Sequence, residues 1–90
     1  MTREQLRTAS DELRKASEAA DDGDLVERLH DQSNQFAQLA TADAGPDHGR
    51  LARHLNALSE MRTAASDDVV EHIDAAEEAI TAYRKTVDGV

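Results

Sequence analysis

The sequence predicts an all-α fold of four short antiparallel helices, arranged as two helical hairpins. Apolar residues recur at steps of three and four almost throughout, no stretch alternates with period two, and one pattern occurs twice. The alternative is three helices, the last running uninterrupted over 47–87, because residues 63–68 contain neither glycine nor proline. Ninety residues suffice for one domain, so we expect a single helical domain over 1–90.

The first two predicted helices begin at sequence signals that satisfy free backbone amides. Thr2 with Gln5, and Asp24 with Glu27, each have the spacing of a capping box. We call the row of apolar residues that a helix turns toward its neighbours its seam. The seam predicted for the first helix is Leu6, Ala9, Leu13, Ala16 and Ala20. The seam predicted for the second helix is Leu25, Leu29, Gln32, Phe36 and Leu39.

The start of the third helix is marked by stronger sequence signals than the start of the fourth. Asp47 follows Gly45-Pro46, a pair that ends one helix and starts the next, whereas only Ser66 and Asp68 mark the fourth start. The third seam is Leu51, Leu55, Leu58, Arg62 and Ala65, with Met61 beside the arginine. The fourth seam is Val69, Ile73, Ala76, Ile80, Tyr83 and Val87.

An internal repeat favours the break between the third and fourth helices. Residues 24–29 align with residues 68–73 at an offset of 44, while Leu6 and Leu13 align with Leu51 and Leu58 at an offset of 45. A shared order of caps and apolar positions is typical of a duplicated structural unit. We therefore expect hairpins over about 2–44 and 47–88, with the turn of the second hairpin at residues 66–68.

The charged residues indicate adaptation to high salt. The chain has nineteen Asp and Glu against ten Lys and Arg, a net charge of −9; eleven of the acids are Asp and eight of the bases are Arg. Short carboxylates hold water and cations, and few lysines leave few apolar stems on the surface. These features, with alanine-rich seams, resemble the small uncharacterised helical proteins of halophilic archaea. The resemblance implies a cytoplasmic protein of unknown role.

Several function classes lack their sequence signatures. The chain has no cysteine, no apolar run approaching the ~18 residues of a membrane span, and an N-terminus unlike a signal peptide. We therefore expect a cytoplasmic location without membrane contact. No basic or aromatic stripe suggests nucleic-acid binding. No nucleophile motif, phosphate loop or dinucleotide fingerprint is present, so we expect no enzyme and no cofactor.

Two sequence features suggest weak cation binding instead. Glu27 and His30 have the E-x-x-H spacing of carboxylate-bridged metal sites, but the sequence holds this motif once where such a site needs two. In an up-down-up-down bundle the first and third turns lie at the same end. Oxygen-rich clusters suit hard cations. The carboxylates expected at that end belong to Asp21, Asp22, Asp24, Asp67 and Asp68.

The composition favours an interaction or assembly module. Leu, Ile, Val and Phe number only sixteen in ninety residues, so a monomer is expected to be marginal and a homodimer favoured. The alternative functions are a small cation-binding protein and an acidic decoy for a basic nucleic-acid-binding protein. We expect self-association through the largest apolar residues of the second and fourth helices. They are Leu25, Val26, Leu29, Phe36, Val69, Val70, Ile73, Ile80, Tyr83 and Val87.

Overall fold

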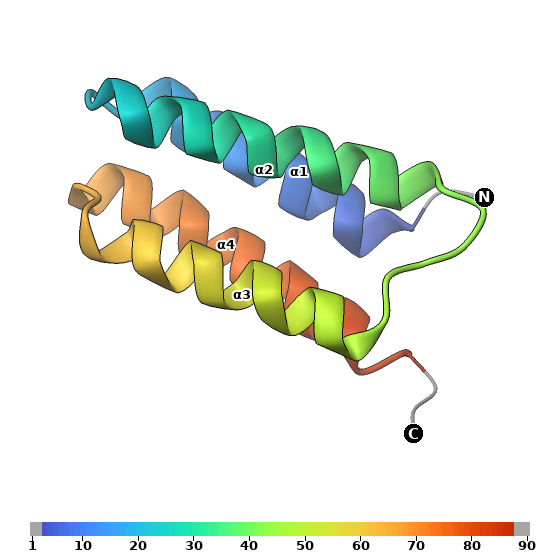
Figure 1. The fold of residues 1–90 in the computed structure, drawn as a ribbon. Coiled ribbons are helices and arrows are strands. Elements are labelled where there is room, and N and C mark those ends of the chain that lie inside the picture. The colour runs from blue at the N-terminus through green and yellow to red at the C-terminus, as the bar shows by residue number, and fades with distance from the viewer. Residues whose placement is uncertain (1–2, 88–90) are drawn as a thin grey trace.

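Residues 3–87 are described by a computed structural model, and they form four α-helices (Figure 1). The helices are α1 (Glu4–Ala19), α2 (Gly23–Thr41), α3 (His48–Thr63) and α4 (Asp67–Arg84). The all-α prediction is confirmed. The predicted break is also confirmed, because α3 ends at Thr63 and α4 begins at Asp67. Within the described residues no helix is both long and apolar enough to cross a membrane.

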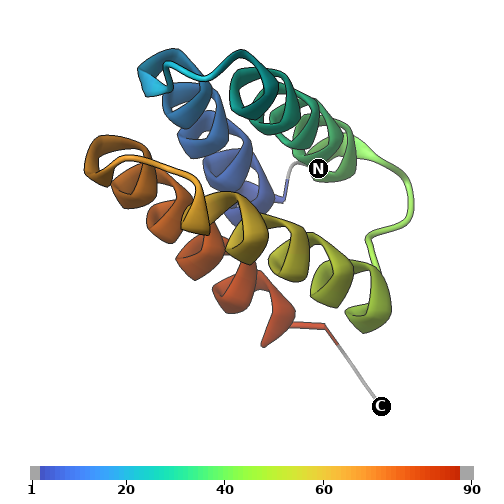
Figure 2. The ribbon, with the colours of Figure 1, turned by 60° about the vertical axis from the view of Figure 1, so that its left-hand side comes forward.

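The two hairpins stack as two layers. Hairpin α1–α2 lies over hairpin α3–α4, with both hairpin turns at one end and the α2–α3 loop at the other (Figures 1 and 2). Helix α1 packs closely against both α2 and α4 along its length. Helix α3 approaches α4 at fewer positions and barely approaches α2. The bundle is therefore tight around α1 and more open around α3.

The helix starts differ in part from the predicted caps. Asp47 caps α3 as predicted, since its Oδ1 accepts a hydrogen bond from the Arg50 amide at 2.8 Å. The cap of α2 is Asp22, not Asp24: Asp22 Oδ1 accepts from the amides of Asp24 (2.9 Å) and Leu25 (3.2 Å). The helix thus begins one residue before the predicted cap, and Asp24 lies in its first turn, where a carboxylate favours the helix dipole. Thr2 lies outside the described residues.

The core confirms three of the four seams and corrects the third. In α3, His54 and Met61 are buried, whereas Leu55 is half-buried and Arg62 is exposed. The helix is rotated from the predicted seam so that His54 packs against Phe36 of α2, and Arg62 reaches outside the core to Asp74 on α4. The buried apolar residues are Leu6, Ala9, Leu13, Ala16, Leu25, Leu29, Phe36, Leu39, Ala40, Leu51, Leu58, Met61, Val69, Ile73, Ala76 and Ile80.

Arg3 joins the start of the chain to the end of α2. Its amide donates to the Ala40 carbonyl at 2.8 Å, and its guanidinium donates to the carbonyls of Leu39 (3.0 Å) and Ala42 (2.7 Å). The last carbonyls of a helix have no partner within the helix. Arg3 therefore serves as a C-terminal cap for α2 and anchors the α1–α2 hairpin at its open end.

Candidate interaction surface

Most of the residues predicted to form a self-association surface lie inside the bundle. Val26, Val70, Tyr83 and Val87 are half-buried, and Tyr83 and Val87 pack against the core. A seam with helical period shows which face of a helix is apolar, but the same seam can face a helix of its own chain. The residues that the chain itself covers are Leu25, Leu29, Phe36, Val69, Ile73 and Ile80.

The predicted acidic cluster gathers at one end of the bundle, where the two hairpin turns lie (Figure 1). Asp21 and Asp22 line a hollow of about 150 Å³ with Ser66 on the neighbouring turn. One carboxylate oxygen of Asp22 already accepts the hydrogen bonds that cap α2. Asp24, Asp67 and Asp68 are exposed and do not line the hollow. Within residues 3–87 no three carboxylate, imidazole or thiol groups lie close enough to hold a metal ion.

The E-x-x-H motif lies on the outer surface of α2. Glu27 and His30 line an open hollow of about 400 Å³, together with Val26 and Asp31 of the same helix. The Nδ1 atom of His30 lies 3.4 Å from the Asn34 amide nitrogen. A single helix supplies every side chain of this hollow, so it lacks the facing helices that enclose a metal in carboxylate-bridged bundles.

His54 is the polar residue that connects α3 to α2. It is 8% exposed, its Nδ1 lies 2.8 Å from Gln32 Oε1, and its ring centroid lies 4.7 Å from that of Phe36. Burial lowers the pKa of the His54 imidazole, and the nearby charges of Arg50 and Arg53 lower it further. The folded state therefore favours the neutral form of the His54 imidazole.

The other two histidines connect helices through single polar contacts. His72 on α4 donates from Nδ1 to Glu12 Oε1 on α1 at 3.0 Å, and this bond lowers the pKa of the Glu12 carboxyl. Arg84 Nε donates to His48 Nδ1 at 3.3 Å, which joins α4 to α3. Each of these imidazoles thus has a structural partner on another helix.

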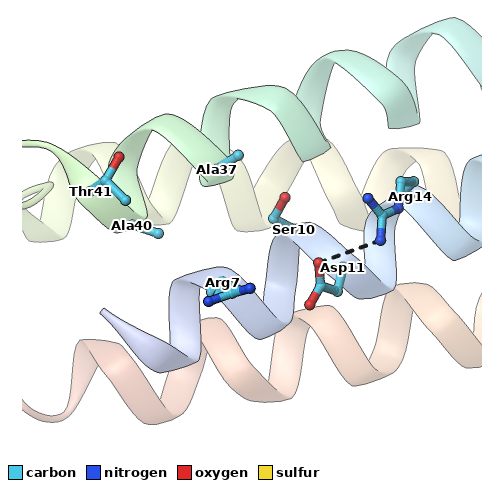
Figure 3. Close-up of a pocket in the computed structure, with 7 residues that line it drawn as sticks. All are labelled: Arg7, Ser10, Asp11, Arg14, Ala37, Ala40 and Thr41. Atoms are coloured by element: carbon cyan, nitrogen blue, oxygen red, sulfur yellow. Dashed lines mark ion pairs between the residues drawn. The ribbon is translucent and has the colours of Figure 1, made fainter. Parts of the chain in front are cut away.

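A recess forms on the outside of the α1–α2 contact, where small residues bring the two helices together. Ser10 Oγ donates to the Ser33 carbonyl and Ser33 Oγ donates to the Ser10 carbonyl, each at 2.8 Å. Beside this buried pair lies a recess of about 230 Å³ (Figure 3). We call it the α1–α2 recess. It is lined by Arg7, Ser10, Asp11 and Arg14 of α1 and by Ala37, Ala40 and Thr41 of α2.

The charged wall of the recess belongs to a regular stripe on α1. Arg14 Nη2 lies 3.7 Å from Asp11 Oδ1, and both side chains are half-exposed or more. Within residues 3–87 the structure gives Arg7 no ion pair. With Glu4 before Arg7 and Glu18 after Arg14, opposite charges alternate at steps of three and four, on one side of the helix. We call these five residues the α1 stripe.

The comparison with known families places the chain but assigns no activity. A model described as "Family of unknown function (DUF7553)" matches residues 1–86. The chain belongs to this family. No curated protein matches the chain significantly. No solved structure matches it significantly either. The DUF7553 family therefore contributes no ligand or site residue.

The α1 stripe was missed at the level of sequence, although its signal is present there. Net charge summed over the first helix is zero, which hides the order of the charges. The spacing of Glu4, Arg7, Asp11, Arg14 and Glu18 is readable directly as a helical stripe. The recess beside it was not readable, because it depends on how closely Ala37 and Ala40 approach α1.

Proposed function

We propose that this chain is a non-enzymatic protein–protein interaction or assembly module. The α1–α2 recess carries the proposal. Its alanines lie opposite two guanidinium groups on an outer face of the bundle. Interfaces are enriched in arginine, which combines an apolar stem with directional donors, and small residues let a partner approach the backbone closely. A partner with carboxylates placed over Arg7 and Arg14 would fit this surface.

The placement of the histidines supports a role without catalysis. His30, His48, His54 and His72 lie near different partners, namely Asn34, Arg84, Gln32 and Glu12. A general base needs to face a reacting group, and a nucleophile needs such a base within hydrogen-bond reach. Here the imidazoles are distributed as single contacts within or between helices, and none of them lines the α1–α2 recess.

Cross-linking in an extract of the native cells, at native salt, tests the proposal. We expect wild-type chain to form defined cross-linked complexes, and the double substitution Arg7→Ala with Arg14→Ala to lose them. The matched control is Arg50→Ala with Arg53→Ala, which removes two exposed arginines from α3 and should retain the complexes. The absence of complexes with wild-type chain, or equal complexes with all three proteins, would contradict the proposal.

The proposed setting is a salt-rich cytoplasm. A net charge of −9 on ninety residues gives self-repulsion that screening relieves, and excluded salts strengthen the burial of a thin core. We expect partial unfolding in dilute buffer and full helicity in molar KCl, measured by circular dichroism over a salt series. A cooperatively melting, fully helical chain at low salt would contradict this setting.

The outer face of α4 favours a second candidate, an acidic decoy for a basic nucleic-acid-binding protein. Its exposed carboxylates are those of Asp67, Asp68, Glu71, Asp74 and Glu78. A row of carboxylates resembles a phosphate backbone in charge, and its binding to a basic protein falls steeply as salt rises. Salt-sensitive binding to a basic DNA-binding protein that is lost with Glu71→Gln and Glu78→Gln, but kept with Arg7→Ala and Arg14→Ala, would favour this candidate.

A further inference from the structure

We infer that the α1 stripe pairs with the α1 stripe of a second copy, antiparallel, to form a two-fold dimer. The inference rests on the proposed interaction function and names its partner. It differs from the dimer expected from sequence, because six of the ten apolar residues named for that dimer are buried in the folded chain. Here the contact is made by exposed charged residues of α1, next to the α1–α2 recess.

The charges of the stripe are self-complementary. Read from either end, Glu4, Arg7, Asp11, Arg14 and Glu18 give the same order of signs: acid, base, acid, base, acid. A two-fold interface requires that when one residue contacts a second, the second contacts the first on the other copy. Any antiparallel pair of identical helices meets this condition. Centred on Asp11 it would bring like charges together, whereas a register shifted along the helix brings acids opposite bases. Spaced by a helical rise of about 1.5 Å per residue, the stripe is about 21 Å long.

An antiparallel register centred near Ala9 places four of the five charges opposite their complements and leaves Glu18 beyond the paired segment. Arg7 then faces Asp11 of the partner subunit, and Glu4 faces Arg14 of the partner subunit, with both pairs repeated by symmetry. This register gives Arg7 the ion pair that it lacks within the described chain. Asp11 would then lie between two guanidinium groups, that of Arg14 of its own helix at 3.7 Å and that of Arg7 of the partner subunit.

The overall charge of the chain singles out α1 for this contact. Two chains of −9 repel each other, and the exposed acids of α4 would face like charges in most orientations. The charges of residues 1–20 cancel, so two copies meet there with the least repulsion. The repeat strengthens the point, because the stripe's counterparts on α3 carry no charge. They are Gly49, Ala52, Asn56, Ser59 and Thr63.

The recess supplies the apolar part of the contact. Ala37 is exposed on the α2 side of the recess (Figure 3), so a side chain that crosses the stripe reaches its methyl group. Exposed ion pairs stabilise an interface by only ~0–1 kcal/mol each. They select direction and register, while the small apolar surface adds to the affinity. The dimer is therefore weak, and it forms at high protein concentration.

Sedimentation equilibrium of the purified full chain tests the inference, in the lowest KCl concentration at which circular dichroism shows full helicity, because added salt screens the ion pairs. We expect a concentration-dependent dimer for wild type and at least about tenfold weaker association for Arg7→Glu with Arg14→Glu, since several ion pairs become repulsions together. The matched control, Arg50→Glu with Arg53→Glu on α3, makes the same change in net charge and should dimerise as wild type does.

Mixing two variants with opposite charge reversals tests whether the stripes contact each other directly. The triple substitution Glu4→Arg, Asp11→Arg, Glu18→Arg makes the stripe entirely basic and should be monomeric alone. Mixed with Arg7→Glu, Arg14→Glu chain, it should form a heterodimer. Where a reversal lowers helicity, Arg7→Gln with Arg14→Gln removes the pairing without added acids and should still weaken association.

Three outcomes overturn the inference: a monomeric wild type to millimolar concentration, an equal loss of dimer in the α3 control, or no heterodimer in the mixture. A monomeric wild type would overturn the dimer but not the proposed interaction function, which the cross-linking experiment tests separately. Cross-linked complexes that depend on Arg7 and Arg14 would then contain other proteins. If the charges served only to stabilise α1 itself, substitution would lower helicity while leaving the sedimenting mass of the folded chain unchanged.

Discussion

The two hairpins share one sequence pattern but pack differently. Hairpin α1–α2 is closed by a pair of buried serines, Ser10 and Ser33, whose hydroxyls bond each other's backbone. At the repeat-related positions hairpin α3–α4 has Leu55 and Glu77, which are both half-buried. Two larger side chains keep α3 and α4 further apart, and α3 accordingly approaches α4 at fewer positions than α1 approaches α2.

The same exchange of small for large residues extends along the contact. Ser17 corresponds to Arg62 and Ala40 to Arg84, and both arginines reach across the wider gap. Arg62 Nε donates to an Asp74 oxygen at 2.7 Å, and Arg84 donates to His48 at 3.3 Å. The size of the residues at the contact, rather than the apolar seam, therefore sets the distance between paired helices. The first hairpin is a compact platform, and α3 is held by longer polar side chains.

Truncating matched core leucines should give the largest difference between the hairpins. Leu13 and Leu58 are repeat-related and fully buried. Leu13 lies on α1, which is fixed by close neighbours on two sides, whereas α3 has room to move into a cavity. Since the cost of truncation rises with the cavity that remains, we expect Leu13→Ala to cost about 4 kcal/mol and Leu58→Ala about 2–3 kcal/mol. Denaturant unfolding measures both, and equal costs would contradict the comparison.

Introducing leucine at a second matched pair should change stability in opposite directions. Ser33→Leu overfills the close α1–α2 contact and removes a buried hydrogen bond, so we expect a loss of about 2–4 kcal/mol. Glu77→Leu should raise the unfolding midpoint, because burial and the neighbouring Asp74 raise the pKa of the Glu77 carboxyl, which shows that the site disfavours its charge. Thermal unfolding at neutral pH distinguishes the two signs. Destabilisation by both substitutions would mean that the contacts are equally tight.

Acid should weaken the attachment of α3 through His54. The folded state lowers the pKa of this imidazole below its ordinary value of 6.5, so the unfolded chain binds the proton first as pH falls. Stability present above pH 6.5 is then lost progressively from that value down to the folded pKa. We expect the free energy of unfolding to fall more between pH 7.5 and pH 5.5 in wild type than in His54→Gln. An identical pH dependence of the two proteins would contradict this role.

The sequence predicts where the helices lie better than it predicts which of their faces pack against one another. Periodicity is a local property, so it predicts the helical segments and the buried faces of α1, α2 and α4, while the internal repeat predicts the break before α4. It does not determine the rotation of α3, because Leu55 and His54 lie on adjoining faces and the choice depends on what α2 presents. Phe36 and Gln32 form the site that receives His54.

The candidate site was less accessible from sequence, for a related reason. A run such as Leu25, Leu29 and Phe36 has the same pattern whether its own bundle or a second chain covers it. The α1–α2 recess follows from the approach of two helices brought together by Ser10 and Ser33, a contact between residues far apart in the chain. The α1 stripe was readable from spacing, but its relation to the recess required the fold.

Native-state hydrogen exchange tests the unequal packing of the hairpins most directly. Amides in regions with few close contacts exchange through local opening, at a lower free energy than global unfolding. The amides of α3 should exchange faster than those of α1 and α2 at salt concentrations that give full helicity, and Ser33→Leu should reduce this difference by loosening the α1–α2 hairpin. Equal protection of α3 and α1 in the wild-type chain would contradict the account.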